Sequence, residues 1–331
     1  MELLSPEELI SASRLPLLET YFKFASERHS MFLKRQKRWN GPLSEDPVLI
    51  EYRFTNAFRA LDRVSQYLIR HVQRPLGLGL SSRDIIARTL LFKIFNKIET
   101  WEFLEEELGV IREKTLSDLK IEHILLGRKN AGKSIYSGAY IMPSPKRGRP
   151  TKHENHLILL RELFLNGTIE NILQSVSLEE LFRKLLKIDS FGQFLAFQYA
   201  IDLNYSKVFN FSESNFVIAG PGALDGLSKC FTEFVPKDAE QKILSIAAHQ
   251  KQLFQYFGLN EVSIGTRQLQ PIDCQNLFCE ISKYSRISHP DTVGISGRTR
   301  IKQRYRPALR SLDPIQLPEF WNLPEYSAET V

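Results

Sequence analysis

The chain has 331 residues, of which 43% are hydrophobic and 25% charged, which is the balance of a globular protein rather than a disordered one. It has no run of 18 apolar residues and no basic-then-apolar start of a signal peptide, so we expect a cytoplasmic protein without a membrane partner. The three cysteines exclude a four-cysteine iron–sulfur cluster, and we expect neither a metal nor a cofactor. The net charge of +6 permits a polyanionic partner.

The N-terminal part is predicted to be helical. Ser5 and Pro6 form a cap followed by a proline at the first helical position, and Pro16 restarts the helix. The segment 17–39 carries several cations: Arg28, Lys34, Arg35, Lys37 and Arg38. They form either a solvated helix face or an edge that faces phosphates.

Residues 47–72 show apolar side chains at helical spacing, which predicts a helix. A second, polar stripe accompanies them: Asn56, Arg59, Arg63, Gln66 and Arg70. Either this stripe is a water-facing surface in which Asp62 pairs with an arginine, or it is a binding face. Helices are also expected over 82–96 and 100–108.

The segment Gly127–Ser134 matches the phosphate-binding loop pattern G-x-x-x-x-G-K-[ST]. In such a loop a helix must follow, but residues 135–145 contain a glycine and two prolines and cannot form one. We therefore expect no nucleoside triphosphate to bind, and interpret residues 127–152 as a long basic loop.

A second helical block is predicted from residue 154 to residue 203, and another helix from Asp238 to Phe257. Between them, residues 215–230 have the pattern of a helix-hairpin-helix around Gly220 and Gly222. These glycines can adopt positive φ and leave amides uncovered at a helix N-terminus, where a phosphate is stabilised. The alternative is an ordinary loop that joins two helices.

The segment 271–284 places Asp273 directly after a proline in the first turn of a helix, where the helix dipole stabilises the charged carboxylate. Glu280 follows two turns later on the same face, about 10 Å along the axis. This spacing suits two carboxylates with different tasks. The alternative is a dipole-complementing aspartate and a solvated glutamate.

The C-terminal tail has basic residues at every second position from 298 to 306. In an extended chain they lie on one side, about 6.6 Å apart. Such an array favours phosphate binding over a plain solvated tail. The predicted fold is all-α, with helical subdomains at 1–126 and 153–297, the basic loop 127–152 between them, and the basic extended tail 298–331.

Several blocks taken together resemble a known family: residues 51–66, 95–101, 138–141, 219–227 and 273–284. They are similar to the alpha-glutamyl/putrescinyl thymine pyrophosphorylase family, also described as the helical domain of hydroxymethyluracil DNA kinases. The resemblance extends from about residue 20 to residue 290. It implies phage-type hypermodified pyrimidines, and the family is similar to helix-hairpin-helix DNA glycosylases and includes an antiphage glycosylase.

This resemblance implies a monofunctional DNA glycosylase that acts on double-stranded DNA with modified bases. It would excise a hypermodified pyrimidine, such as glucosylated hydroxymethylcytosine, from phage DNA and leave abasic sites in antiphage defence. Asp273 would be catalytic, stabilising the positively charged sugar. Leu224 stands where bifunctional members carry their lysine, which implies hydrolysis without lyase chemistry.

The remaining expected site residues bind the DNA. Those for the flipped base are Asn56, Arg59 and Arg63, with Phe54 or Tyr140 stacking on it. Those for backbone phosphates are Gly220, Gly222, Lys229, Arg298, Arg300, Lys302 and Arg304.

One departure from the glycosylase pattern concerns spacing: Asp273 follows Gly222 by 51 residues, a longer distance than the pattern has. Asp225, Asp238 and Glu280 therefore stay possible replacements for the catalytic acid. Two other functions also remain open. One is a transferase or pyrophosphorylase that acts on the substituent of hypermodified thymine in DNA, and the other is a non-catalytic reader of modified DNA.

Overall fold

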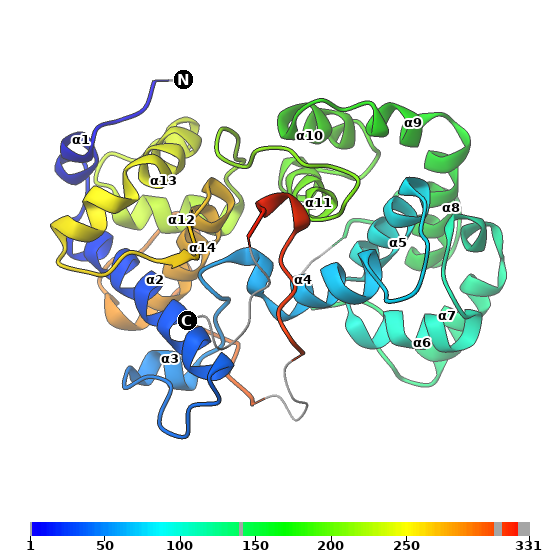
Figure 1. Cartoon of the computed structure of the whole chain (residues 1–331), viewed down its shortest axis with the longest axis horizontal. Helices are drawn as coiled ribbons and strands as arrows, with labels where there is room; N and C mark the ends of the chain where they lie inside the picture. Colours follow the sequence, from blue (N-terminus) through cyan, green and yellow to red (C-terminus); the bar gives the residue numbers. More distant parts are fainter. Residues whose placement is uncertain (1, 139–141, 308–312, 324–331) are drawn as a thin grey trace. The chain divides into compact units, whose positions relative to one another are not determined.

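The computed structural model describes residues 2–138, 142–307 and 313–323, and the chain divides into two compact units. The first unit comprises Met1–Asp62, Glu213–Leu317 and Leu323–Val331, and the second comprises Arg63–Ser212 and Pro318–Asn322 (Figure 1). The predicted boundaries at residues 126 and 152 differ from this division. The chain leaves the first unit after Asp62 and returns to it at Glu213, so the first core is built from segments that are distant in sequence.

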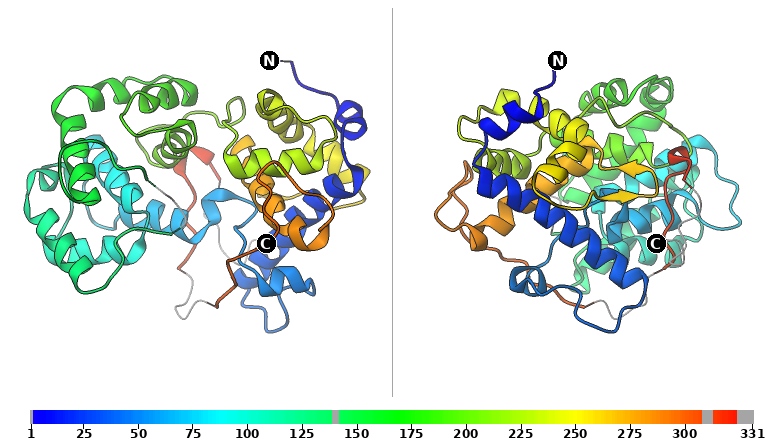
Figure 2. Two further views of the ribbon diagram at one scale, coloured as in Figure 1. Left: turned by 180° about the vertical axis from the view of Figure 1, so that it is seen from behind. Right: turned by 60° about the vertical axis from the view of Figure 1, so that its left-hand side comes forward.

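The first unit is helical, as predicted for the whole chain, with one short antiparallel hairpin in which Ser263 pairs with Gln268. Its elements are α1 (Pro6–Ser11), α2 (Leu15–Gln36), α3 (Pro47–Glu51), the 3-10 helix η1 (Arg59–Leu61), α12 (Pro221–Cys230), the 3-10 helix η4 (Pro236–Asp238), α13 (Ala239–Tyr256), β1 (Ser263–Ile264), β2 (Arg267–Gln268) and α14 (Pro271–Ser288). Helix α14 packs against α2, α12 and α13. The right-hand view of Figure 2 shows α2, in blue, at the front of this unit.

The close approach of α12 to α14 depends on glycine. A Cβ atom at Gly226 would lie 2.8 Å from the carbonyl carbon of Phe278, and one at Gly222 would lie 3.1 Å from Sγ of Cys279. Both positions lie on the face of α12 that packs against α14. The two helix backbones touch there because neither residue has a side chain.

The second unit contains most of the remaining helices. Its elements are α4 (Arg63–Tyr67), the π-helix η2 (Leu68–Gln73), α5 (Ser82–Phe95), α6 (Ile98–Leu108), the 3-10 helix η3 (Glu113–Ser117), α7 (Lys120–Asn130), α8 (Lys152–Leu165), α9 (Thr168–Leu173), α10 (Leu178–Leu186), α11 (Gln193–Asn204) and the 3-10 helix η5 (Glu319–Trp321). The helices expected over 82–96 and 100–108 are confirmed as α5 and α6.

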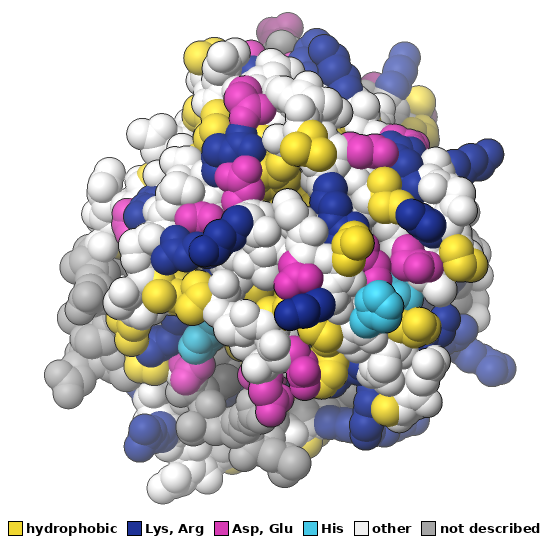
Figure 3. Space-filling model, turned by 90° about the vertical axis from the view of Figure 1, so that its right-hand side faces the viewer, with side chains coloured by type: hydrophobic (Ala, Val, Ile, Leu, Met, Phe, Trp, Pro, Cys, Tyr) yellow, Lys and Arg dark blue, Asp and Glu magenta, His cyan; other side chains and the backbone are white. Residues whose placement is uncertain are grey.

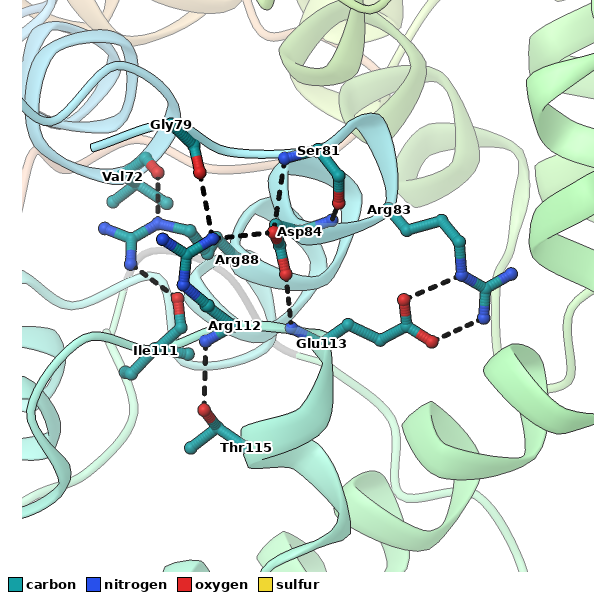
Figure 4. Close-up of polar contacts among 10 residues, drawn as sticks. All are labelled: Val72, Gly79, Ser81, Arg83, Asp84, Arg88, Ile111, Arg112, Glu113 and Thr115. Atoms are coloured by element: carbon teal, nitrogen blue, oxygen red, sulfur yellow. Dashed lines mark hydrogen bonds and ion pairs between the residues drawn. The ribbon is translucent and has the colours of Figure 1, made fainter.

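A fully buried arginine organises the centre of the second unit. Arg88 on α5 donates to the carbonyl oxygens of Val72 (2.5 Å) in η2 and of Ile111 (2.7 Å) in the segment after α6 (Figure 4). On the same helix, Asp84 completes a capping box with Ser81 and accepts from Arg112 at 3.0 Å. These contacts are structural: buried backbone acceptors are satisfied by one fixed guanidinium.

The structure corrects the helix predicted over residues 47–72. Helix α3 ends at Glu51, residues 53–58 are irregular, and only the short elements η1, α4 and η2 follow. The polar stripe from Asn56 to Arg70 therefore does not form one helix face. Tertiary contacts of residues 53–62 with α2 and α14 replace the local helical hydrogen bonds.

The helix-hairpin-helix is also not formed. Helix α12 begins at Pro221, but the preceding helix α11 ends at Asn204 and the chain between them is irregular. Gly220 is the cap of α12 with φ −78°, and neither Gly220 nor Gly222 has the positive φ that was expected. For Gly222, the packing of α12 on α14 gives the reason for a glycine instead.

The predicted basic loop 127–152 is shorter than expected, since α7 extends to Asn130 and α8 begins at Lys152. Its cation Arg147 pairs with Glu162 and Asp189, both at 2.7 Å.

No helix within the described ranges has the length and apolar character needed to cross a membrane.

Candidate nucleic-acid interface

The basic tail lies against the first unit in an extended form, as its period of two predicts. Tyr52 and Arg304 form an antiparallel bridge, and the amide of Tyr305 donates to the carbonyl oxygen of Glu51 at 2.9 Å. The Arg304 side chain makes an ion pair with Glu51 and lies over the ring of Tyr52. Residues 303–305 are thus held beside α3, and Figures 1 and 2 show this segment, in orange, near α3.

A cation–π contact joins the tail to the C-terminal end of α2. The guanidinium carbon of Arg35 lies 5.3 Å from the ring centroid of Tyr305. Two basic segments that are far apart in sequence therefore lie side by side. We call them together the basic strip, which consists of Lys34, Arg35, Lys37, Arg38, Arg298, Arg300, Lys302, Arg304 and Arg306.

Most cations of the strip are exposed, among them Lys37, Arg38, Arg300 and Lys302. The backbone of Arg300 is fixed by Arg286, whose Nη1 donates to its carbonyl oxygen at 2.9 Å. A surface with this density of cations attracts a polyanion through the release of its counterions.

The second unit presents a different surface. On the face drawn in Figure 3, Lys and Arg side chains stand beside Asp and Glu side chains throughout the view. Several of its arginines are neutralised by ion pairs, for example Arg83 with Glu113 (2.5 Å) and Arg161 with Glu122 (2.5 Å). The basic strip of the first unit is therefore the better candidate for a contact with phosphates.

The first unit also contains a polar cluster around residues 53–62, a segment that α2 and α14 hold in place. Arg28 of α2 is buried, which lowers its pKa to about 10, and it donates to Thr55 O (3.0 Å) and to Asn56 Oδ1 (3.1 Å). From α14, Glu280 accepts the amide of Thr55 at 3.3 Å and pairs with Lys283 at 2.6 Å. The Asn56 side chain is thus used to fix this segment.

Asp62 is the member of the cluster whose protonation is most perturbed. The pKa of its carboxyl group is raised to about 7, chiefly by burial and in smaller part by the nearby Glu280, although the amide of Asn56 acts in the other direction by donating to Oδ1 at 2.7 Å. A carboxyl group with this pKa can accept or release a proton at neutral pH.

Asp273 has a different environment from the one predicted. Its Oδ1 accepts the amide of Arg59 at 2.7 Å and its Oδ2 accepts the amide of Gln270 at 3.0 Å. The side chain is buried, and burial raises its pKa in spite of these amides and the nearby Arg267. Both carboxylate oxygens accept backbone amides, so Asp273 links η1 to the start of α14.

The structure gathers several of the predicted base-binding residues with Asp273 in this cluster, namely Phe54, Asn56 and Arg59. Phe54 packs against Phe24 at 5.3 Å rather than standing open. Arg63 belongs to the second unit, where it lies 3.7 Å from Glu99. Tyr140 lies outside the described residues.

The predicted phosphate ligands on α12 face inward. Lys229 is only 1% exposed, and its Nζ donates to Ser282 O (3.0 Å) and Ser285 Oγ (3.1 Å) of α14. Gly222 packs against α14 as described above. In the folded unit, Lys229 is a buried structural cation. The alternative acid Asp225 is also engaged, because its Oδ2 accepts from Ser282 Oγ at 2.5 Å.

Two residues of this region were not singled out from the sequence, Trp39 and Tyr305, and Asp62 was considered only as the partner of an arginine. Trp39 is 59% exposed and follows a segment with four cations among residues 34–38. This pairing of an exposed tryptophan with a basic run is a signal that the sequence does contain. The role of Tyr305 depends on its contact with Arg35, which only the fold creates.

The described residues contain no group of three or more His, Cys, Asp or Glu side chains arranged for a metal ion. The motif Gly127–Ser134 does not fit a triphosphate, because its first residues form the end of α7 and the described residues 135–138 and 142–151 form no helix. The amides of a phosphate-binding loop must instead open a helix. We therefore assign no step to this motif.

Comparison with known proteins gives two matches. The family model described as "5-hmdU DNA kinase, helical domain" matches residues 15–294. A protein of Bacillus phage SP10 named "5-hmdU DNA kinase" is 24% identical over 307 residues, which cover 85% of this chain and 47% of the phage protein. The chain thus spans about half the length of this relative. No solved structure matches significantly.

These findings correct the prediction of a hydrolytic DNA N-glycosylase, which is wrong. The relative is named as a kinase, and a kinase transfers a phosphoryl group without cutting a glycosidic bond. The expectation that no nucleoside triphosphate is involved also loses its support, since kinases consume one.

Proposed function

Because the chain belongs to the family of 5-hmdU DNA kinase helical domains, we propose that it binds DNA with a modified pyrimidine and takes part in group transfer to the substituent of that base. The observation that carries this proposal is the convergence of two basic segments through Arg35 and Tyr305. In this proposal the two segments together form the surface that contacts the phosphates of DNA. The name of the phage relative supplies the modified base.

The basic strip would position the DNA without reading its sequence. Cations at alternate positions of an extended tail contact successive phosphates, and those at the end of α2 extend the same surface. Recognition of the modified base needs separate contacts, which the strip does not provide.

For the chemistry, the polar cluster offers a proton acceptor. A hydroxyl group on the base substituent must lose its proton when a group is transferred to its oxygen. Asp62, with a pKa of about 7, is the described carboxyl group best suited to take that proton at neutral pH. The N-glycosidic bond of the nucleotide stays intact in this reaction.

A second candidate function is that of a reader, which binds modified DNA without changing it. It is favoured by the misfit of the Gly127–Ser134 motif to a triphosphate and by the absence of a metal-binding group among the described side chains. The two functions share the DNA surface and differ in chemistry.

The experiment that tests both uses duplexes with thymine or with 5-hydroxymethyluracil at one position. Binding is measured by fluorescence anisotropy at several salt concentrations, and the duplexes are then incubated with γ-labelled nucleoside triphosphate and Mg²⁺ and digested to nucleosides for mass spectrometry. Label on the modified nucleoside, lost in Asp62→Asn, supports the transferase. Salt-dependent binding with unchanged nucleosides supports the reader, and no binding of either duplex refutes both.

A further inference from the structure

A groove with a volume of ≈ 730 Å³ opens on the first unit, between α2, the segment 37–46 and α14. Its lining includes Phe24, Glu27, Lys34, Trp39, Asp46 and Tyr284. Lys34 belongs also to the basic strip, so the groove and the strip adjoin. The volume falls within the range of sites that enclose a small ligand.

Trp39 forms an open aromatic wall of this groove, with 59% of its surface exposed. Gly41 allows its position, because a Cβ atom there would lie 2.5 Å from Nε1 of the indole. The indole therefore lies close to its own backbone and presents a flat surface. Stacking on such a surface is the sequence-tolerant way in which proteins hold an unpaired nucleobase.

The opposite wall is polar and fixed. The hydroxyl group of Tyr284 donates to Asp46 Oδ2 at 2.6 Å, while Asp46 Oδ1 accepts the amide of Val48 at the start of α3. Phe24 packs edge-on against Tyr284 at 5.3 Å. These contacts keep the wall in place before any ligand enters.

Glu27 is a polar group of the groove that can accept a further hydrogen bond. It is half-buried and lines the groove, and it makes no hydrogen bond or ion pair with another residue of the described ranges. A carboxylate accepts hydrogen bonds but cannot donate them. It would thus favour a ligand with an O–H or N–H group over one with a methyl group at the same place.

We propose that this groove receives one extrahelical pyrimidine, which stacks on Trp39 while Glu27 accepts a hydrogen bond from the hydroxyl group of its substituent. The inference rests on the DNA-binding part of the proposed function, since the basic strip must hold the flanking phosphates, and it places Glu27 rather than Asp62 at the hydroxyl group of the substituent. Flipping costs a few kcal/mol, which stacking and phosphate contacts offset. Thymine, with a methyl group in place of the hydroxymethyl group, would leave Glu27 unpaired and bind more weakly.

The fluorescence of Trp39 provides a direct test. The chain has three tryptophans, and both Trp101 and Trp321 are buried, at 2% and 8% exposure. Quenching by a stacked base therefore reports on Trp39. The full chain is titrated with duplexes that carry 5-hydroxymethyluracil or thymine at one position. The variants are Trp39→Phe, Glu27→Ala and, as a control, Glu233→Ala, which changes an exposed glutamate outside the groove.

We expect strong quenching by the modified duplex, weak quenching by the thymine duplex, and no such difference in Trp39→Phe. Glu27→Ala, which removes the acceptor, should reduce the preference for the modified duplex roughly tenfold, while Glu233→Ala should not change it. Equal quenching by both duplexes, or an unchanged preference in Glu27→Ala, would overturn the base pocket. If salt-dependent binding and label on the modified nucleoside persist in that case, the proposed function stands and only the pocket fails.

Discussion

The guanidinium carbon of Arg35, near the end of α2, lies 5.3 Å from the ring centroid of Tyr305 in the C-terminal tail. A contact of this kind contributes about 0.5–1 kcal/mol at an exposed site. It adds to the bridge between Tyr52 and Arg304 in holding the basic tail against the first unit. The position of the tail can therefore be changed without removing any of its charges.

Replacing Tyr305 by alanine should weaken duplex binding about two- to fivefold, because the tail then loses the contact that orders it beside α2. Anisotropy titration at fixed salt measures the effect. Tyr305→Phe keeps the ring and should bind like wild type. Equal loss in both variants would show that the hydroxyl group rather than the ring matters.

Arg300→Ala and Lys302→Ala should each reduce the slope of log affinity against log salt by about 0.9, since each removes one phosphate contact. Arg183→Ala, an exposed arginine of the second unit that pairs with Glu179, is the matched control and should leave the slope unchanged. A slope that falls equally in the control would place the DNA elsewhere.

Asp273→Ala should lower the free energy of unfolding by about 1–3 kcal/mol, because the amides of Arg59 and Gln270 lose their acceptor. Urea denaturation measures it, with the exposed Asp291→Ala as control. A variant as stable as wild type would contradict the structural role that we assign to this carboxylate.

The protonation of Asp62 predicts a pH dependence of stability. The folded pKa, about 7, lies above the ordinary value of 3.8, so the carboxyl group contributes stability at acid pH that is lost as the pH rises through 7. Asp62→Asn retains an acceptor for the Asn56 amide and cannot ionise. We expect it to gain on the order of 2–4 kcal/mol over wild type between pH 4 and pH 8. The free energy of unfolding is measured by urea denaturation of both proteins across this pH range. If it changes with pH in the same way in both, the raised pKa of Asp62 is contradicted.

Gly226→Ala should destabilise the first unit by about 2–4 kcal/mol, since the new Cβ atom would collide with the backbone of Phe278 on α14. Gly127→Ala is the opposite case: it lies within α7 with no atom near its Cβ position, and should stabilise the protein by about 0.5–1 kcal/mol. Thermal unfolding compares the two. Similar effects of both substitutions would argue against the close packing of α12 on α14.

The sequence by itself determined the helical class and the ends of several helices, because caps and prolines act locally. Ser5 with Pro6 begins a helix as predicted. The tail is extended as its alternating cations indicate, and the family was identified from blocks of residues alone.

Only the tertiary structure decided what those residues do. The apolar spacing over 47–72 indicated a helix, yet Arg28, Asp273 and Glu280 hold residues 53–62 in an irregular form by contacts between segments that are distant in sequence. The glycines of α12 serve helix packing because α14 lies against them, which no local pattern encodes. The raised pKa of Asp62 and the meeting of Arg35 with Tyr305 likewise arise from burial and proximity, which exist only once the chain has folded.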